Sequence, residues 1–103
     1  MKHILLWIFI LPNLVSASVD DWEPLFDQQL TNADYPEGIW KMEDGILTAT
    51  EDQCIWTKES YENFVLDLEF KTAEGTNSGV IVYCTDTEKW IPNSVEIQIA
   101  DDY

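Results

Sequence analysis

The stretch FVLDLEFKT, residues 64–72, decides the fold. Its large apolar side chains at positions 64, 66, 68 and 70 alternate with Val65, Asp67, Glu69 and Lys71. A period of two is that of a β-strand, whose successive side chains point to opposite faces. The stretch therefore predicts a strand with one face on a core and the other largely in water.

The segments around this strand are short, rich in β-branched and aromatic residues, and separated by turn signals. Asp44-Gly45 lies between the strand-like runs 40–42 and 46–50 and predicts a hairpin. Further runs cover 54–58, 80–84 and 95–100, and Gly75 with Asn77-Ser78-Gly79 predicts the turn before the run at 80–84. Because no helical periodicity competes and no linker divides the chain, the sequence predicts one all-β domain, a sandwich or a barrel.

Six strands do not close a sandwich of this type, and an open sheet edge tends to pair with other chains. A chain of this length also buries a limited fraction of its surface. We therefore expect residues 18–103 to be the N-terminal part of a larger domain.

The N-terminus predicts a signal peptide spanning residues 1–17. Lys2 and His3 precede an apolar run from Ile4 to Leu11, which is too short to cross a bilayer. Val15-Ser16-Ala17 supplies the small or β-branched residues that a signal peptidase accepts, so we expect cleavage after Ala17 and export to the periplasm or the outside medium. The alternative is a short buried strand at the start of the fold.

Composition restricts the partners. The chain carries 20 Asp and Glu against 5 Lys and Arg, a formal charge of −15. Without the leader it has no arginine and no histidine, and its lysines do not cluster, which argues against nucleic acid and against an anionic membrane surface. The acidity keeps an exported protein soluble, suits a salty medium, or provides carboxylates for a cation.

The two cysteines, Cys54 and Cys84, allow two interpretations. An oxidising compartment permits a disulfide between them, but both lie in apolar segments where a free cysteine is a common small core residue. No cluster of Cys and His suggests a zinc site. Without histidine in residues 18–103, Ser78 has no partner for a Ser-His pair.

The strand at 95–100 carries the candidate chemistry. Glu96 and Gln98 are two residues apart and point the same way, so both can reach sugar hydroxyls, although an ordinary solvated strand face has the same pattern. Glucanases of the sandwich type carry Glu, Asp and Glu at alternate positions, where this chain has Gln98 and Ala100. The paired carboxylates of a retaining glycosidase are therefore missing from this strand. Trp90 lies in an irregular stretch and is available to stack on a sugar.

An ordered set of motifs resembles the 3-keto-disaccharide hydrolase family, also known as domain of unknown function 1080 or the 3-keto-glucoside 1,2-lyase and 3-keto-2-hydroxy-glucal hydratase domain. The motifs are WEPLFD at 22–27, WKMEDGIL at 40–47, FVLDLEF at 64–70, NSGV at 77–80 and VEIQI at 95–99. Their order covers most of residues 22–102. The family usually continues to a Gly-Leu-Gln-Asp-His-Gly-like segment that this chain does not contain.

The resemblance implies a concanavalin-like jelly roll of antiparallel strands, incomplete here, that acts on glycosides oxidised at C3. The ketone acidifies the hydrogen at C2, so a base removes it, the glycosidic oxygen leaves, and water adds to the glucal. Such chemistry needs a base and a group that stabilises an enolate, for which a divalent cation of unknown identity is a candidate. The resemblance suggests Glu96 as base or metal ligand, with Gln98, Asn77, Asp101 and Trp90 binding substrate.

Three functions remain open at this stage. The first is a lyase or hydrolase of 3-keto-glycosides that is active at full length, with the present chain inactive alone. The second is a non-catalytic, lectin-like module in which Trp90 and Gln98 contact a carbohydrate. The third is a structural surface domain without a ligand.

Overall fold

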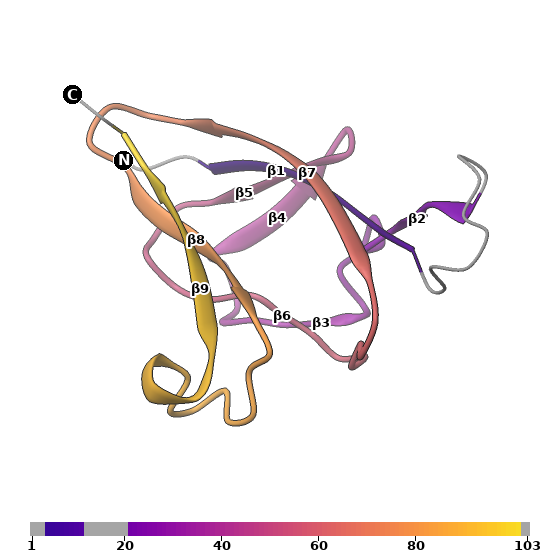
Figure 1. Ribbon diagram of the computed structural model, residues 1–103. Helices are drawn as coiled ribbons and strands as arrows, with labels where there is room; N and C mark the ends of the chain where they lie inside the picture. Colours follow the sequence, from indigo (N-terminus) through magenta and orange to yellow (C-terminus); the bar gives the residue numbers. More distant parts are fainter. Residues whose placement is uncertain (1–3, 12–20, 102–103) are drawn as a thin grey trace.

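The computed structural model describes residues 4–11 and 21–101. Its regular structure consists mainly of antiparallel β-strands, with the short 3-10 helix η2, which confirms the predicted all-β class, an incomplete sandwich (Figure 1). No helix in this described part has the length and apolar character needed to cross a membrane. The elements are β1 (Ile4–Leu11), β2 (Glu23–Pro24), β3 (Ala33–Asp34), β4 (Trp40–Glu43), β5 (Ile46–Ala49), β6 (Trp56–Thr57), β7 (Val65–Thr72), β8 (Asn77–Val82), η2 (Ile91–Asn93) and β9 (Val95–Ala100).

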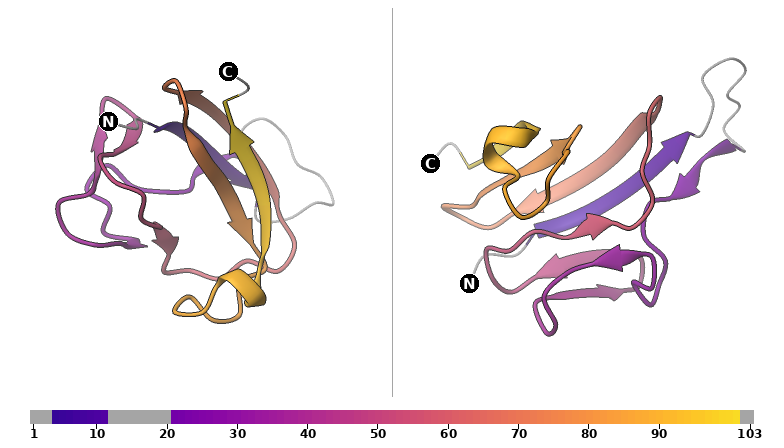
Figure 2. Two further views of the ribbon diagram at one scale, coloured as in Figure 1. Left: turned by 90° about the vertical axis from the view of Figure 1, so that its left-hand side faces the viewer. Right: turned by 90° about the horizontal axis from the view of Figure 1, so that it is seen from below.

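Three sheets share these strands. The largest contains β1, β2, β4, β5 and β7, and the others are the pairs β3–β6 and β8–β9. Within the largest sheet, β1 pairs with β7 over all eight of its residues, from Ile4↔Thr72 to Leu11↔Val65. It also pairs with β2 and β5. Because a strand has two edges, β1 lies between β7 on one side and β5 with β2 on the other, as Figure 2 shows.

The apolar run predicted as part of a signal peptide is thus strand β1 here. The predicted cleavage site after Ala17 lies outside the described residues. Cleavage and export therefore stay predictions.

The predicted Asp44-Gly45 hairpin is confirmed. Strands β4 and β5 pair from Trp40↔Ala49 to Glu43↔Ile46, which leaves two residues in the turn. Asp44 and Gly45 both have positive φ, at 51° and 76°. Positive φ at both central residues is the geometry of the type I′ turn that matches the twist of two paired strands.

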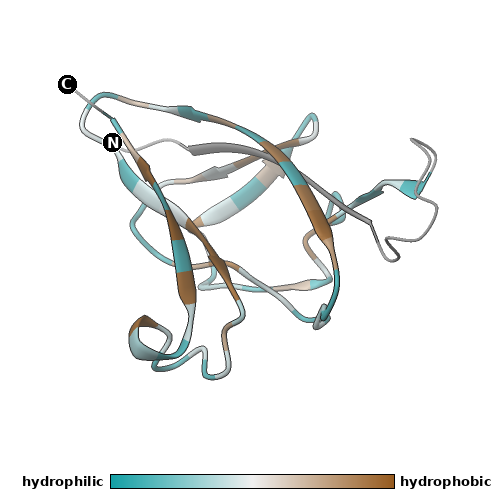
Figure 3. Ribbon diagram, viewed as in Figure 1, coloured by the Kyte–Doolittle hydropathy of each residue, from teal (hydrophilic) through white to brown (hydrophobic). Residues whose placement is uncertain are grey.

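The alternation predicted for β7 is confirmed at most positions. Val65, Asp67 and Glu69 are exposed, whereas Leu66 and Leu68 are half-buried, and bands of opposite hydropathy follow the strand in Figure 3. Phe70 departs from the pattern, since 52% of it is exposed. The described layers do not extend over that end of the apolar face.

Two predicted segments need correction. Asn77-Ser78-Gly79 is not a turn, because these residues open strand β8. The turn is made earlier, where Thr76 N–H donates to the Ala73 carbonyl at 3.1 Å and Gly75 has φ of 72°. The predicted strand at 80–84 ends at Val82, and Tyr83, with φ of 54°, leaves the extended conformation.

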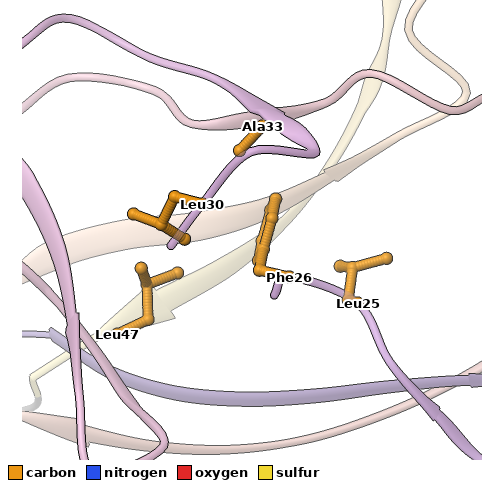
Figure 4. Packing of buried hydrophobic residues seen from close by; sticks show 5 residues of the cluster. All are labelled: Leu25, Phe26, Leu30, Ala33 and Leu47. Atoms are coloured by element: carbon orange, nitrogen blue, oxygen red, sulfur yellow. The ribbon is translucent and has the colours of Figure 1, made fainter. Parts of the chain in front are cut away.

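The core is formed where the loop at 25–33 packs on β5. Leu47 is fully buried, and around it lie buried Leu25, Phe26, Leu30 and Ala33 (Figure 4). Half-buried apolar side chains from the neighbouring strands and loops pack against this cluster: Tyr35, Trp40, Met42, Ile55, Tyr61, Phe64 and Leu66.

Asp27 holds that loop in shape. Its Oδ1 accepts the backbone N–H groups of Gln29 at 3.0 Å and Thr31 at 2.9 Å, and its Oδ2 accepts the Thr31 hydroxyl. Asn32 ties the loop back by donating to the Leu25 carbonyl at 3.0 Å. The hydrogen bonds that the Asp27 carboxylate accepts, that of the Thr31 hydroxyl first, lower the pKa of Asp27 from its ordinary value.

Replacing Leu47 with alanine tests the position of the core. Because Leu47 has no exposed surface, the change should cost about 2–5 kcal/mol in the free energy of unfolding, measured by urea denaturation. The matched control is Ile91→Ala, since 76% of Ile91 is exposed, and its effect should stay within about 0.5 kcal/mol. Equal effects of the two changes would contradict the core described above.

Replacing Asp27 with asparagine tests the loop by pH. A carboxyl whose pKa is lowered in the fold stabilises the fold above its unfolded pKa of about 3.9, and this contribution is lost as the pH falls through the lower folded value. The wild-type chain should therefore lose more thermal stability between neutral and acidic pH than Asp27→Asn. The same change at exposed Asp67 is the control, and it should leave the pH profile nearer that of wild type.

Candidate functional site

The candidate site lies on one face of the β8–β9 hairpin. The two strands pair without interruption from Asn77↔Ala100 to Val82↔Val95, and Gly79 lies opposite Gln98. Residues that lie opposite one another share a face, and so do alternate residues along a strand. Asn77, Gly79, Glu96 and Gln98 therefore gather on one face, and the last two are exposed.

A hydrogen bond joins the two amides of this face. Gln98 Nε2 donates to Asn77 Oδ1 across the two strands. An amide has a separate acceptor and donor group, so this bond uses the Asn77 oxygen and leaves its N–H₂ group to donate elsewhere. The Gln98 oxygen in turn remains an acceptor. The pair thus offers a donor and an acceptor from strands that are remote in sequence.

Glu96 owes its position to Gly79. A Cβ atom built on Gly79 would lie 2.4 Å from Glu96 Oε1 and 2.7 Å from Glu96 Cγ. The side chain of Glu96 therefore lies directly over the glycine backbone. Glycine inside a strand commonly marks such a close approach. The sequence alone predicts a turn at Gly79 and does not reveal this role.

Both cysteines are free and half-buried, and Cys54 lies close enough to Glu96 to feel its charge. Burial raises the pKa of the Cys54 thiol, and the negative charges of Asp52 and Glu96 raise it further. A raised pKa keeps the thiol protonated at neutral pH, whereas the thiolate is the nucleophile. Cys54 is therefore poorly suited to covalent catalysis.

The remaining predicted residues lie at the two ends of the hairpin. Asp101 follows β9, and its Oδ2 accepts the Gly75 N–H at 2.7 Å, so this carboxylate fastens the turn before β8. Trp90 lies in the connection from β8 to β9, is half-buried, and directly precedes η2. Its carbonyl accepts the Ser94 hydroxyl at 2.7 Å. The structure thus brings Glu96, Gln98 and Asn77 together, with Asp101 at the near end and Trp90 in the far loop.

The donor set does not assemble a metal centre in the described part of the chain. Among those residues no group of three or more His, Cys, Asp and Glu side chains could hold an ion. The face of the hairpin offers one carboxylate, that of Glu96, beside two neutral amides. We derive no step through a cation from these residues.

Gly79→Ala tests the contact between the glycine and Glu96. The new methyl group should force the Glu96 side chain away, because the two cannot lie 2.4 Å apart. Because the atoms in the way belong to the exposed, flexible side chain of Glu96, which can move, we expect a cost in urea of at most about 1 kcal/mol.

The same substitution in a Glu96→Ala background should cost clearly less, since the clash is gone, and this double-mutant cycle is the measurement. Additive effects would show that the glycine is needed for another reason. Ser78→Ala is the neighbouring control on the opposite face.

Comparisons with known proteins agree with this fold. A family model described as the 3-keto-alpha-glucoside-1,2-lyase-like domain matches residues 17–103. A crystal structure described as that of a glycosyl hydrolase from Parabacteroides distasonis ATCC 8503 is 65% identical, with a TM-score of 0.76 over 80% of this chain. The match covers 42% of that protein, so the present chain spans less than half of its length. A search of curated proteins gives no match.

Proposed function

Since the chain belongs to the 3-keto-alpha-glucoside-1,2-lyase-like family, we propose that it is the N-terminal part of an enzyme that cleaves or hydrates 3-keto-glycosides. The observation that carries the proposal is the placement of Glu96 on an exposed strand face, over Gly79 and beside two amides. The proposed reaction is an elimination, which needs one positioned base and a group that stabilises an enolate, not two close carboxylates.

In this mechanism Glu96 removes the proton at C2 of the sugar. The C3 ketone takes up the electron pair of that C–H bond as an enolate. The enolate then returns to the ketone as the C1=C2 double bond forms and the glycosidic oxygen leaves from C1, and this oxygen takes up a proton from Glu96 or from water. Water adds to the resulting glucal in a second step. A positioned general base typically contributes about 10²–10⁴-fold to the rate of such a proton transfer.

The amides of Asn77 and Gln98 are suited to binding the substrate and not to transferring the proton. The free N–H₂ group of Asn77 can donate to an oxygen that gains charge, such as the enolate oxygen. The free oxygen of Gln98 can accept from a sugar hydroxyl. Their mutual hydrogen bond fixes both amides before the sugar binds, which lowers the cost of ordering them.

Export forms part of the proposal. Residues 1–17 carry the features of a secretory leader, and residues 18–103 would then meet glycosides in the periplasm or the outside medium. Trp90 and Asp101 belong to the proposed substrate contacts at the two ends of the hairpin.

The test is Glu96→Gln, made in this chain and at the aligned position of the longer solved relative. The probe is methyl 3-keto-α-glucoside in D₂O, because loss of the C2 proton signal in NMR reports the base step separately from cleavage. In the longer protein we expect exchange and cleavage to fall together by about 10²–10⁴-fold, while sugar binding persists.

The matched control is Glu69→Gln, on an exposed position of β7, which should leave both rates unchanged. Unchanged C2 exchange in the Glu96→Gln protein would exclude Glu96 as the base. Saturable binding of the sugar without any exchange in the unsubstituted protein would instead favour a carbohydrate-binding module.

A further inference from the structure

The hairpin β8–β9 carries the candidate site, but it pairs with no other strand in the described part of the chain. It forms a two-stranded sheet of its own, apart from the large sheet and from the pair β3–β6. A two-stranded hairpin by itself is only marginally stable in water. Contacts other than strand pairing must therefore hold this hairpin against the rest of the chain.

Two cysteines lie at the boundary between the hairpin and the rest of the chain. Cys84 follows the end of β8 at Val82, and Cys54 lies in the segment between β5 and β6. Both residues are outside regular strands, so a small shift of either one breaks no ladder hydrogen bond. Both are free, half-buried thiols.

The neighbours of Cys54 fasten it to the apolar core. Ile55 packs against the buried cluster around Leu47. The carbonyl of Gln53 accepts the indole N–H of Trp40 at 3.0 Å, and Trp40 packs against the same cluster. The backbone at Cys54 is thus held on both sides.

The residue before Cys84 reaches the same cluster. The ring of Tyr83 packs against that of Phe64, with 6.0 Å between the centroids. Phe64 in turn packs against the buried cluster. Cys54 and Cys84 therefore approach one part of the core from two segments that are remote in sequence.

The charges around Cys54 agree with this placement. Burial is the first cause of the raised pKa of Cys54, and the charge of Asp52 is the second. The charges of Glu96 and of a Cys84 thiolate raise this pKa further, so the two sulfur atoms lie within reach of each other's charge. A disulfide carries no charge, which suits a half-buried place among carboxylates.

We propose that a disulfide joins Cys54 and Cys84 in an oxidising environment and ties the hairpin β8–β9 to the core. The thiolate of one cysteine attacks a low-molecular-weight disulfide, such as oxidised glutathione, and releases one thiol. The other cysteine then attacks the mixed disulfide and releases the second thiol. The two cysteines lose two electrons and two protons, which the two released thiols carry away. The proposal is independent of any role of Glu96 in catalysis.

The experiment treats the reduced 103-residue chain with oxidised glutathione. Mass spectrometry after tryptic digestion should find peptides 42–58 and 72–89 joined, because trypsin cleaves at lysines between the two cysteines. The oxidised chain should melt about 10 °C above the reduced chain. The amides of residues 95–100 should also exchange more slowly with D₂O, because the hairpin is then fastened.

Cys54→Ser and Cys84→Ser are the matched controls, since each leaves a single thiol. In both variants the oxidant should not raise the melting temperature or slow the exchange. If the unsubstituted chain gives only disulfide-linked dimers or glutathione adducts, without the joined peptides, the proposal is wrong.

A second measurement needs no variant and covers the case in which a serine variant does not fold. The ratio of the disulfide form to the dithiol form is measured in a glutathione buffer of fixed composition, in water and in concentrated urea. If the fold brings the two sulfur atoms together, this ratio should be at least about 30-fold higher in water, because the bond and the fold stabilise each other equally. An equal or lower ratio in water would show that the fold holds the cysteines apart.

Discussion

The burial of Leu47 is the constraint on which the rest of the chain depends. The loop at 25–33 packs against the Leu47 side chain. The backbone of Leu47 pairs with Met42 of β4 and Leu6 of β1. The position therefore joins the hairpin β4–β5, the irregular loop and the large sheet in one place. A small chain buries few side chains completely, so the loss of one such contact destabilises the whole fold.

Local turn chemistry made part of this fold predictable. Asp44-Gly45 specifies its hairpin without help from distant residues, because both positions need positive φ. The alternation of β7 was also predictable, because apolar and polar residues alternate along the sequence of a half-buried strand. The exposure of Phe70 was not predictable, because it depends on how far the covering layer extends. The packing of the loop at 25–33 was not predictable either, because the loop has no periodic pattern.

The candidate site was likewise only partly predictable from the sequence. Glu96 and Gln98 share a face because they are two residues apart on one strand, which the sequence alone indicates. Their association with Asn77 and Gly79 depends on the register of β8 against β9. Without that register, asparagine and glycine together indicate a turn. The error at residues 77–79 therefore arose because a glycine that makes room for a cross-strand side chain cannot be told from a turn glycine.

The hairpin that carries the proposed base is exposed at most positions of β9. Val95 and Ile97 are 55% and 59% exposed, so the face of β9 opposite Glu96 is apolar and only partly covered in the described structure. Glu96 and Gln98 are exposed on the other face. Stabilisation of an enolate is strongest where water is excluded and donors are fixed. We therefore expect Glu96 to act as a base most effectively when the hairpin that carries it is covered. In this view the present chain supplies the base and the amide pair, and catalysis needs the cover that makes them rigid.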